Sequence, residues 1–166
     1  MGSSRLSHRE RSRCVGRWIA QSGYHLLCGG GGGVMAAVSE AFVGTSSRKG
    51  RAIGVLPSSI QHAGEPPSGY PNRWIEIVIR THLNKRGSAG AHSDSRNHVN
   101  VLSSDVVIVL PGAEGTASEA QLALCYGRPC VAYLDDRSQV PDLPLSVPVE
   151  SEFERVKQFV LDASRQ

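Results

Sequence analysis

The sequence predicts an α/β fold in which a doubly wound, mostly parallel sheet lies between two layers of helices, a three-layer α/β/α arrangement. Segments with helical periodicity alternate with short apolar segments along the chain. Two of the apolar segments run into glycine-bearing loops, and a helical pattern follows each loop. A length of 166 residues and a hydrophobic share of 40% suit one core, so we expect a single domain over residues 1–166.

The first half of the chain predicts two helices and three strands. Ser7 and Glu10 have the spacing of a capping box, and the apolar periodicity after them predicts a helix over residues 8–21 that ends before Gly23. Residues 57–72 are rich in proline and residues 81–95 are polar, so both are predicted loops. The expected strands are Tyr24–Cys28, Arg51–Leu56 and Trp74–Ile79, and the second helix is expected to line one face with Val34, Met35, Val38, Ala41 and Phe42.

The second half predicts three helices and two or three strands. Val106–Leu110 is a run of five apolar residues, which is typical of a strand buried on both faces. A helix is expected over Ala117–Tyr126, because Gly127 and Pro129 follow it. The other expected elements are a helix over Arg96–Ser103, a strand over Cys130–Leu134, a short strand at Leu145–Val149, and a last helix that follows a capping box at Ser151–Glu154 and buries Phe153, Val156 and Val160.

Composition excludes several classes of protein. The net charge is only +3 and the basic residues are not interleaved with aromatic ones, so no nucleic-acid partner is expected. No apolar run reaches the roughly 20 residues that span a bilayer, and no signal-peptide core is visible, so we expect a cytoplasmic protein without a membrane partner. The cysteines, at positions 14, 28, 125 and 130, lack CxxC spacing, so they are expected to be free thiols and no protein-ligated metal is expected.

The two glycine loops are Gly29–Gly33 and Pro111–Gly115. Each follows a buried strand and precedes a helix, which places both at the carboxyl edge of a parallel sheet, where ligands bind. Glycine lets the backbone approach a ligand closely, and a helix N-terminus offers free amides, so phosphate is the natural occupant. The absence of a G-K-[ST] sequence argues against an ATPase. Glu119 has two interpretations, since it either caps its own helix with Thr116 or faces the sugar of a bound nucleotide.

Three motifs together resemble the LONELY GUY-like family of Rossmann-like proteins, which was once described as lysine decarboxylase-like. The loop at Gly29–Met35 is similar to the family's G-G-G-x-G-V-M motif. An arginine, Arg96, stands nine residues before Asp105, the acidic start of a buried strand. The third motif, P-G-G-x-G-T-x-x-E, is similar to residues 111–119, with Ala113 in place of the second glycine. The resemblance implies a Rossmann-like fold.

Two branches of the family imply different functions. In the branch that cleaves nucleoside 5′-monophosphates, an N-glycosidic hydrolysis, the arginine and the last glutamate of the motifs are catalytic, which would make Arg96 and Glu119 catalytic here. This chain lacks the Met-His before the arginine, the lysine after it, and the first glutamate of the E-E pair, where Ser118 stands. The molybdenum cofactor carrier branch is more similar, over residues 96–106 and 115–124.

The carrier branch implies a homo-oligomer, a dimer or a tetramer, that binds a phosphorylated pterin whose dithiolene holds the molybdenum. A nucleoside monophosphate is the alternative ligand.

The resemblance also gives an expectation for the start of the chain. Family members begin with a strand that ends in a G-S-S/G-x loop, and residues 2–5 are similar to that loop without its strand. We therefore expect that the first strand, central in this fold, is missing or truncated and that the natural start lies upstream; a tag remnant is the other interpretation. The expected ligand-binding residues are Gly2, Ser3, Ser4, Arg5, Gly29, Gly30, Gly31, Gly32, Gly33, Val34, Met35, Arg96, Asn100, Pro111, Gly112, Ala113, Glu114, Gly115, Thr116 and Glu119.

Overall fold

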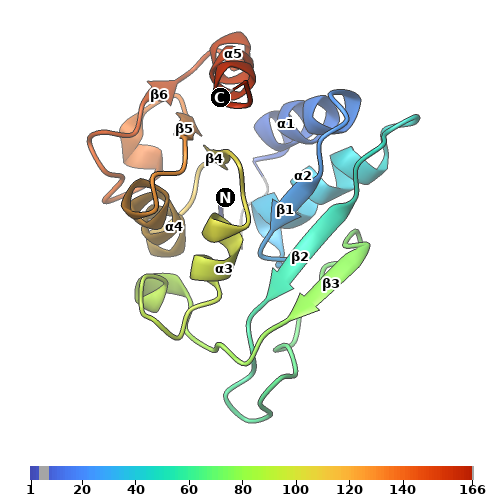
Figure 1. Ribbon diagram of the computed structural model, residues 1–166, viewed down its shortest axis with the longest axis vertical. Coiled ribbons are helices and arrows are strands. Elements are labelled where there is room, and N and C mark those ends of the chain that lie inside the picture. The colour runs from blue at the N-terminus through green and yellow to red at the C-terminus, as the bar shows by residue number, and fades with distance from the viewer. Residues whose placement is uncertain (4–7, 166) are drawn as a thin grey trace.

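The computed structural model describes residues 1–3 and 8–165, and in them helices alternate with parallel strands (Figure 1). The predicted α/β class is confirmed. In chain order the elements are α1 (Arg9–Gln21), β1 (Leu26–Cys28), α2 (Gly33–Val43), β2 (Ala52–Leu56), β3 (Ile77–Arg80), the 3-10 turn η1 (Gly87–Ala89), α3 (Asn97–Leu102), β4 (Val107–Val109), α4 (Glu114–Cys125), β5 (Cys130–Tyr133), the 3-10 turn η2 (Arg137–Gln139), β6 (Val149–Glu150) and α5 (Phe153–Ala163).

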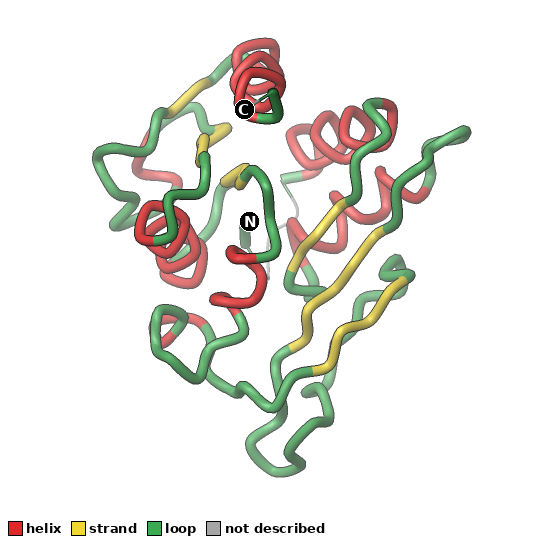
Figure 2. Tube along the Cα trace, viewed as in Figure 1, coloured by secondary structure: helices red, strands yellow, loops and turns green. Residues whose placement is uncertain are grey.

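The strands form two three-stranded parallel sheets, in the orders β1-β2-β3 and β4-β5-β6. Figure 2 shows the two groups of strands side by side with helices around them. Leu26 is paired with Ala52 at the start of the first sheet, and Val107 is paired with Cys130 at the start of the second. Because all strands in a sheet are parallel, the loops that follow them lie at the same edge of that sheet.

The start of the chain lies between the two sheets, beside β4 (Figure 1). The Met1 ammonium donates a hydrogen bond to the Ile108 carbonyl (2.7 Å), and the Leu110 amide donates to the Met1 carbonyl (2.7 Å). These two bonds are the pattern that a parallel neighbour of β4 would make. Residues 1–3 thus lie where the resemblance expects the central strand to end, and the expectation about the upstream strand stays a prediction.

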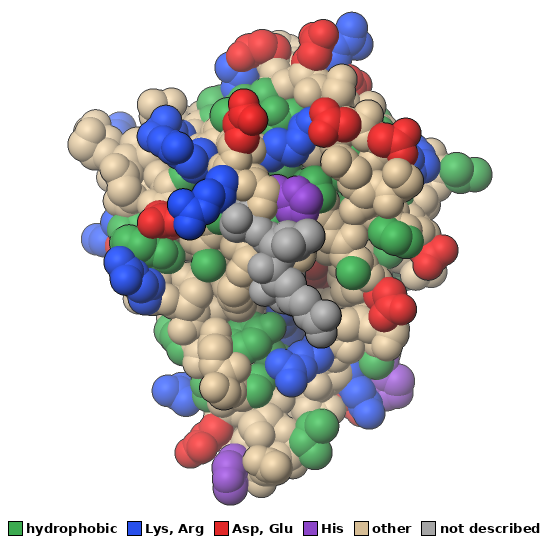
Figure 3. Space-filling view, turned by 180° about the vertical axis from the view of Figure 1, so that it is seen from behind, with side chains coloured by type: hydrophobic (Ala, Val, Ile, Leu, Met, Phe, Trp, Pro, Cys, Tyr) green, Lys and Arg blue, Asp and Glu red, His purple; other side chains and the backbone are tan. Residues whose placement is uncertain are grey.

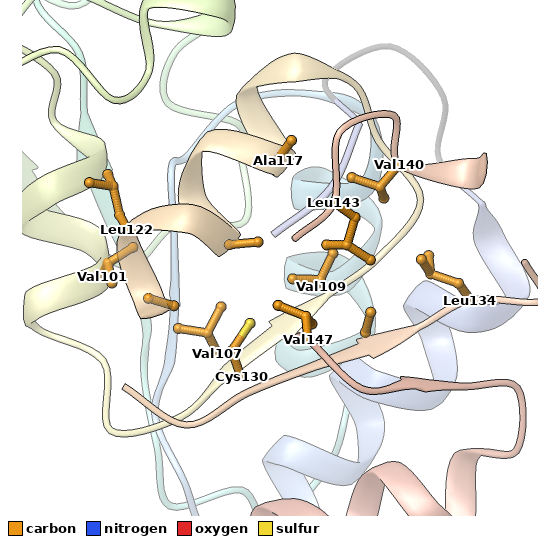
Figure 4. Packing of buried hydrophobic residues seen from close by; sticks show 13 residues of the cluster. Val101, Val107, Val109, Ala117, Leu122, Cys130, Leu134, Val140, Leu143 and Val147 are labelled. Atoms are coloured by element: carbon orange, nitrogen blue, oxygen red, sulfur yellow. The ribbon is translucent and has the colours of Figure 1, made fainter. Parts of the chain in front are cut away.

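Two clusters of buried residues hold the fold together. One fills the space between α4 and the β4-β5-β6 sheet, and Figure 4 shows Val109, Leu143 and Val147 close together near its centre. The other joins α1 and α2 to the strands and contains Phe42, which is fully buried. Gly16 lets these two helices come close, because an added Cβ there would overlap the Val38 carbonyl.

Seen from behind, the molecule carries Lys and Arg side chains among acidic ones (Figure 3). Three exposed arginines of α1, Arg9, Arg13 and Arg17, line a groove of about 280 Å³ between α1 and α2. No helix among the described residues is long and apolar enough to cross a bilayer.

Several element boundaries differ from the predicted ones. The helix expected from Ala117 begins at Glu114, one turn earlier, with Ala113 as its N-cap. The capping box expected at Ser151 does not form, because Glu152 is the N-cap of α5 and makes no side-chain cap hydrogen bond. The capping box expected at Ser7 lies outside the described residues, and α1 has His8 as its N-cap.

Candidate functional site

The two glycine loops lie at the carboxyl ends of β1 and β4, as predicted. Gly33 opens α2 and Glu114 opens α4, and neither helix has a side chain that caps its first turn. Both helices are longer than ten residues, so each carries a partial positive charge at its start, although the Val34 amide of α2 already donates to the Ser3 carbonyl. This arrangement favours an anionic group near the loops.

Residues 2 and 3 connect the two loops. The Ser3 amide donates to the Pro111 carbonyl (2.8 Å), and the Ser3 carbonyl accepts from the Val34 amide (2.8 Å). An added Cβ on Gly2 would lie only 2.5 Å from Val34 Cγ1, so no larger residue fits there without movement. Four predicted site residues, Gly2, Ser3, Val34 and Pro111, therefore meet in one place. Two others, Ser4 and Arg5, lie outside the described residues.

Arg96, Asn100 and Glu119 form a buried polar cluster behind the first loop. Arg96 precedes α3 and is 5% exposed, and Glu119 on α4 is 7% exposed. Arg96 Nη1 and Asn100 Nδ2 each donate to Glu119 Oε1 over 3.3 Å. The Arg96 guanidinium lies against Gly29, where an added Cβ would overlap it. The fold thus brings Gly29 next to Arg96, 67 positions later in the sequence, and Arg96 next to Glu119, 23 positions later.

The cluster carries two buried polar atoms without a hydrogen-bond partner among the described residues, Arg96 Nε and Asn100 Oδ1. One is a donor on a cation and the other is an acceptor. A buried polar atom without a partner costs free energy, and native proteins tolerate few of them away from functional sites. Arg96 Nε and Asn100 Oδ1 are therefore candidate contacts for a bound group.

Glu119 does not cap its helix. The N-cap of α4 is Ala113, so Thr116 and Glu119 both lie inside the helix, and the Glu119 carboxylate is turned toward α3. The capping-box interpretation of Thr116 and Glu119 is therefore wrong. Thr116 is buried beside Gly112, where an added Cβ would overlap the Thr116 hydroxyl.

Asn72 holds the first glycine loop in place, and sequence reasoning missed it. Its backbone amide donates to the Gly30 carbonyl (2.7 Å), and its side-chain Nδ2 donates to the Gly31 carbonyl (2.9 Å). Gly31 also lies against Tyr70 and Met35, where an added Cβ would be 3.0 Å and 2.7 Å from their nearest atoms. Asn72 is the last residue of the long proline-rich loop 57–72, which has no motif of its own, so nothing in the sequence pointed to this contact.

The remaining predicted residues lie around the start of α4. Ala113 and Glu114 are exposed there, and Gly115 lies near Gly87 of η1, the nearest atom being 3.4 Å from an added Cβ. A cavity of about 310 Å³ opens beyond the end of β2 and is lined by residues 58–61, Pro67, Asn84 and Arg86. The Arg86 guanidinium lies 6.0 Å from the centre of the Tyr70 ring, and Tyr70 lies against Gly31 of the first glycine loop.

Cys28 is the last residue of β1 and immediately precedes the first glycine loop. Its Sγ accepts a hydrogen bond from the Gly30 amide (3.4 Å) and lies 3.8 Å from Ser39 Oγ. Burial raises the pKa of the Cys28 thiol and outweighs the opposing effect of these hydrogen bonds. Cys28 is therefore a neutral packing group. Among residues 1–3 and 8–165, no group of three or more His, Cys, Asp or Glu side chains is placed to hold a metal ion.

Comparisons with known proteins identify the family of the chain. The family model described as LDcluster4, SLOG cluster4 family, matches residues 1–158. An uncharacterized protein of Archaeoglobus fulgidus is 32% identical over 114 residues, which cover 69% of this chain and 62% of the relative.

Two solved structures are similar over almost the whole chain. The molybdenum cofactor binding protein from the phototrophic bacterium Rippkaea orientalis has 29% identity and a TM-score of 0.69, and the match covers 98% of this chain and 93% of that one. The molybdenum cofactor carrier protein of Chlamydomonas reinhardtii has 27% identity and a TM-score of 0.66, with 97% and 96% covered.

Proposed function

The chain belongs to the SLOG cluster4 family, and on this basis we propose that it binds a phosphorylated, nucleotide-like ligand between its two glycine loops, with the molybdenum cofactor as the first candidate. The predicted resemblance to the LONELY GUY-like family is confirmed, and two solved relatives bind or carry that cofactor according to their descriptions. Their identities of 27–29% support a shared class of ligand.

The observation that carries the proposal is the pair of buried unpaired atoms on Arg96 and Asn100. A phosphate oxygen is an acceptor for Arg96 Nε, and a ring or amino N–H is a donor for Asn100 Oδ1. A phosphorylated pterin contains both groups. The starts of α2 and α4, which lack side-chain caps, add positive potential at the same edge of the fold.

The protein's part is then to bind and orient the ligand. Arg96 would neutralise negative charge, Glu119 would hold the guanidinium and the Asn100 amide in place, and the glycines would let the backbone approach the phosphate. In the molybdenum cofactor the dithiolene of the pterin supplies the metal ligands. The proposal also includes a cytoplasmic setting, where the four free cysteines would stay reduced, and a homo-oligomeric carrier.

The test is to purify the protein from a molybdate-fed host and to measure bound molybdenum and pterin. We expect both in the wild type and a loss of at least about tenfold in Arg96→Ala, because a charge-assisted hydrogen bond of about 1.5–3 kcal/mol disappears. Arg155→Ala is the matched control, since Arg155 is an exposed arginine of α5. A wild-type protein with no pterin under these conditions would contradict the proposal, and so would an Arg96→Ala variant with full occupancy.

Hydrolysis of nucleoside 5′-monophosphates is the second candidate. The observation in its favour is the direct contact of Arg96 with Glu119, the two residues that the resemblance implies to be catalytic in the hydrolytic branch. The carboxylate would stabilise the positive charge that develops on the sugar as the base leaves. Incubation with AMP should then release ribose 5-phosphate, and Glu119→Gln should abolish the release. Wild-type protein that releases none would exclude this candidate.

A further inference from the structure

The strand β3 leaves apolar side chains uncovered at the edge of its sheet. Ile77, Val78 and Ile79 are 44%, 40% and 41% exposed, although strands of a parallel sheet are normally buried on both faces. All four residues of β5, by contrast, are buried. Figure 1 shows β3 as the outermost strand of the β1-β2-β3 sheet, and no described strand pairs with its outer edge.

The exposed edge lacks the features that normally prevent strand pairing. Edge strands are usually blunted by proline, by a bulge, or by a charge in the middle of the strand. The sequence from 76 to 80 is Glu-Ile-Val-Ile-Arg, so the charges stand only at its two ends and have opposite signs. Such a segment is complementary to its own reversed copy.

We propose that β3 pairs with β3 of a second copy of this chain, antiparallel, across a twofold axis at Val78. This register places Val78 opposite the second copy's Val78, and Ile77 opposite its Ile79. It also places Glu76 opposite the second copy's Arg80, on the same face as Val78, because alternate residues of a strand share a face. Every cross-strand pair is then either apolar with apolar or a pair of opposite charges.

The register is specific. Moving the twofold axis by one residue, to Ile79, would place Val78 opposite Arg80 and Ile77 opposite Thr81, which loses both the matched apolar pairs and the charge pair. A twofold axis also limits the β3 contact to two copies, because each edge is used once. The two β1-β2-β3 sheets would join into one continuous six-stranded sheet.

Glu76 is fixed at the start of β3 by groups of its own chain. Arg48 binds it through two hydrogen bonds of 2.8 Å and 2.9 Å, and Arg51 adds a third over 3.2 Å. These contacts and the Ala52 amide fix the carboxylate at the start of β3. Arg80, at the other end of the strand, has no ion pair within the described part of the chain, so it is available to the second copy.

The first test is the oligomeric state of the whole chain, measured by light scattering after size-exclusion chromatography at about 10–100 μM. We expect a dimer or a higher even-numbered oligomer, and we expect Val78→Lys to raise the dissociation constant of the β3 contact by about 100-fold or more, because it opposes two like charges at the axis. Ile60→Lys is the control, since Ile60 is an equally apolar residue, 86% exposed, in a loop. A monomeric wild type, or a Val78→Lys variant with an unchanged assembly, would overturn the proposal.

The second test does not depend on how well a charged variant folds. Residues that face each other at a hydrogen-bonded antiparallel position have Cα atoms about 5.5 Å apart, within the range of a disulfide. Val78→Cys should therefore form a disulfide-linked dimer on mild oxidation. Ile77→Cys should not, because residue 77 faces residue 79 of the second copy, so the two introduced cysteines are offset by two positions along the strands. Wild-type protein gives the baseline from its four free cysteines. Equal cross-linking of the two variants would overturn the register.

Discussion

Replacing Gly29 by alanine should destabilise the protein by breaking an ion pair that Gly29 itself does not form. The added Cβ would lie 2.5 Å from Arg96 Cζ and 2.6 Å from Nη1, where ordinary contacts are near 3.4–4 Å. The guanidinium must therefore move by about 1 Å. Because Arg96 is 5% exposed and its Nη1 lies 3.3 Å from Glu119 Oε1, this shift would separate the two charges. Gly29→Ala is thus expected to destabilise the protein because it moves Arg96 away from Glu119.

The magnitude follows from the burial of both charges. Separating a buried ion pair leaves two poorly solvated groups, and removing one partner of such a pair costs about 3–5 kcal/mol. Since both partners remain and can partly readjust, we expect a loss of about 3 kcal/mol in the free energy of unfolding. With an m-value of about 2 kcal/mol/M, the urea midpoint should fall by about 1.5 M.

The assay is urea unfolding followed by circular dichroism, with two comparison variants. Gly115→Ala is the matched control in the second loop, because its added Cβ meets nothing closer than 3.4 Å and it lies in a helix, so we expect a change within about 1 kcal/mol. In a Glu119→Ala background the Arg96 guanidinium has no partner to lose, so Gly29→Ala should cost less than about 1 kcal/mol. Equal costs of Gly29→Ala in both backgrounds would refute the reasoning.

Three further predictions concern other parts of the molecule. Burial opposes ionisation of Glu76, but its hydrogen bonds from Arg48 and nearby groups hold its pKa at about 2. The stabilisation by the ionised carboxylate should therefore be complete above about pH 5 and should fall by about 1 kcal/mol toward pH 2. Acid unfolding of Glu76→Gln should lack this pH-dependent loss of stability. Cys28 should resist iodoacetamide at pH 8 while exposed Cys125 reacts, and mass spectrometry that finds equal labelling would contradict its burial. Phe42→Ala should cost about 3–5 kcal/mol in thermal or urea unfolding, because the side chain is fully buried, and a loss below about 1 kcal/mol would be inconsistent with that packing.

Hydrophobic patterning and glycine placement were enough to predict the architecture. Period-2 and period-3.6 patterns in the chain indicated where strands and helices lie, because these periods follow from backbone geometry alone. The position of each glycine loop after a strand predicted the edge of the sheet at which it lies. The exact helix starts were less predictable, as α4 shows, because T-x-x-E patterns occur inside helices as well as at their ends.

The sequence by itself selected Arg96, Asn100 and Glu119 as candidates, while only the tertiary structure decided how they act on one another. Arg96, Asn100 and Glu119 could be selected from motifs, but whether Glu119 caps its helix or binds Arg96 depends on how α3 packs against α4. The contact of Asn72 with the first glycine loop depends on a long loop that carries no motif. Side-chain pairing between distant segments is set by packing in three dimensions, which local patterns of a single sequence do not record.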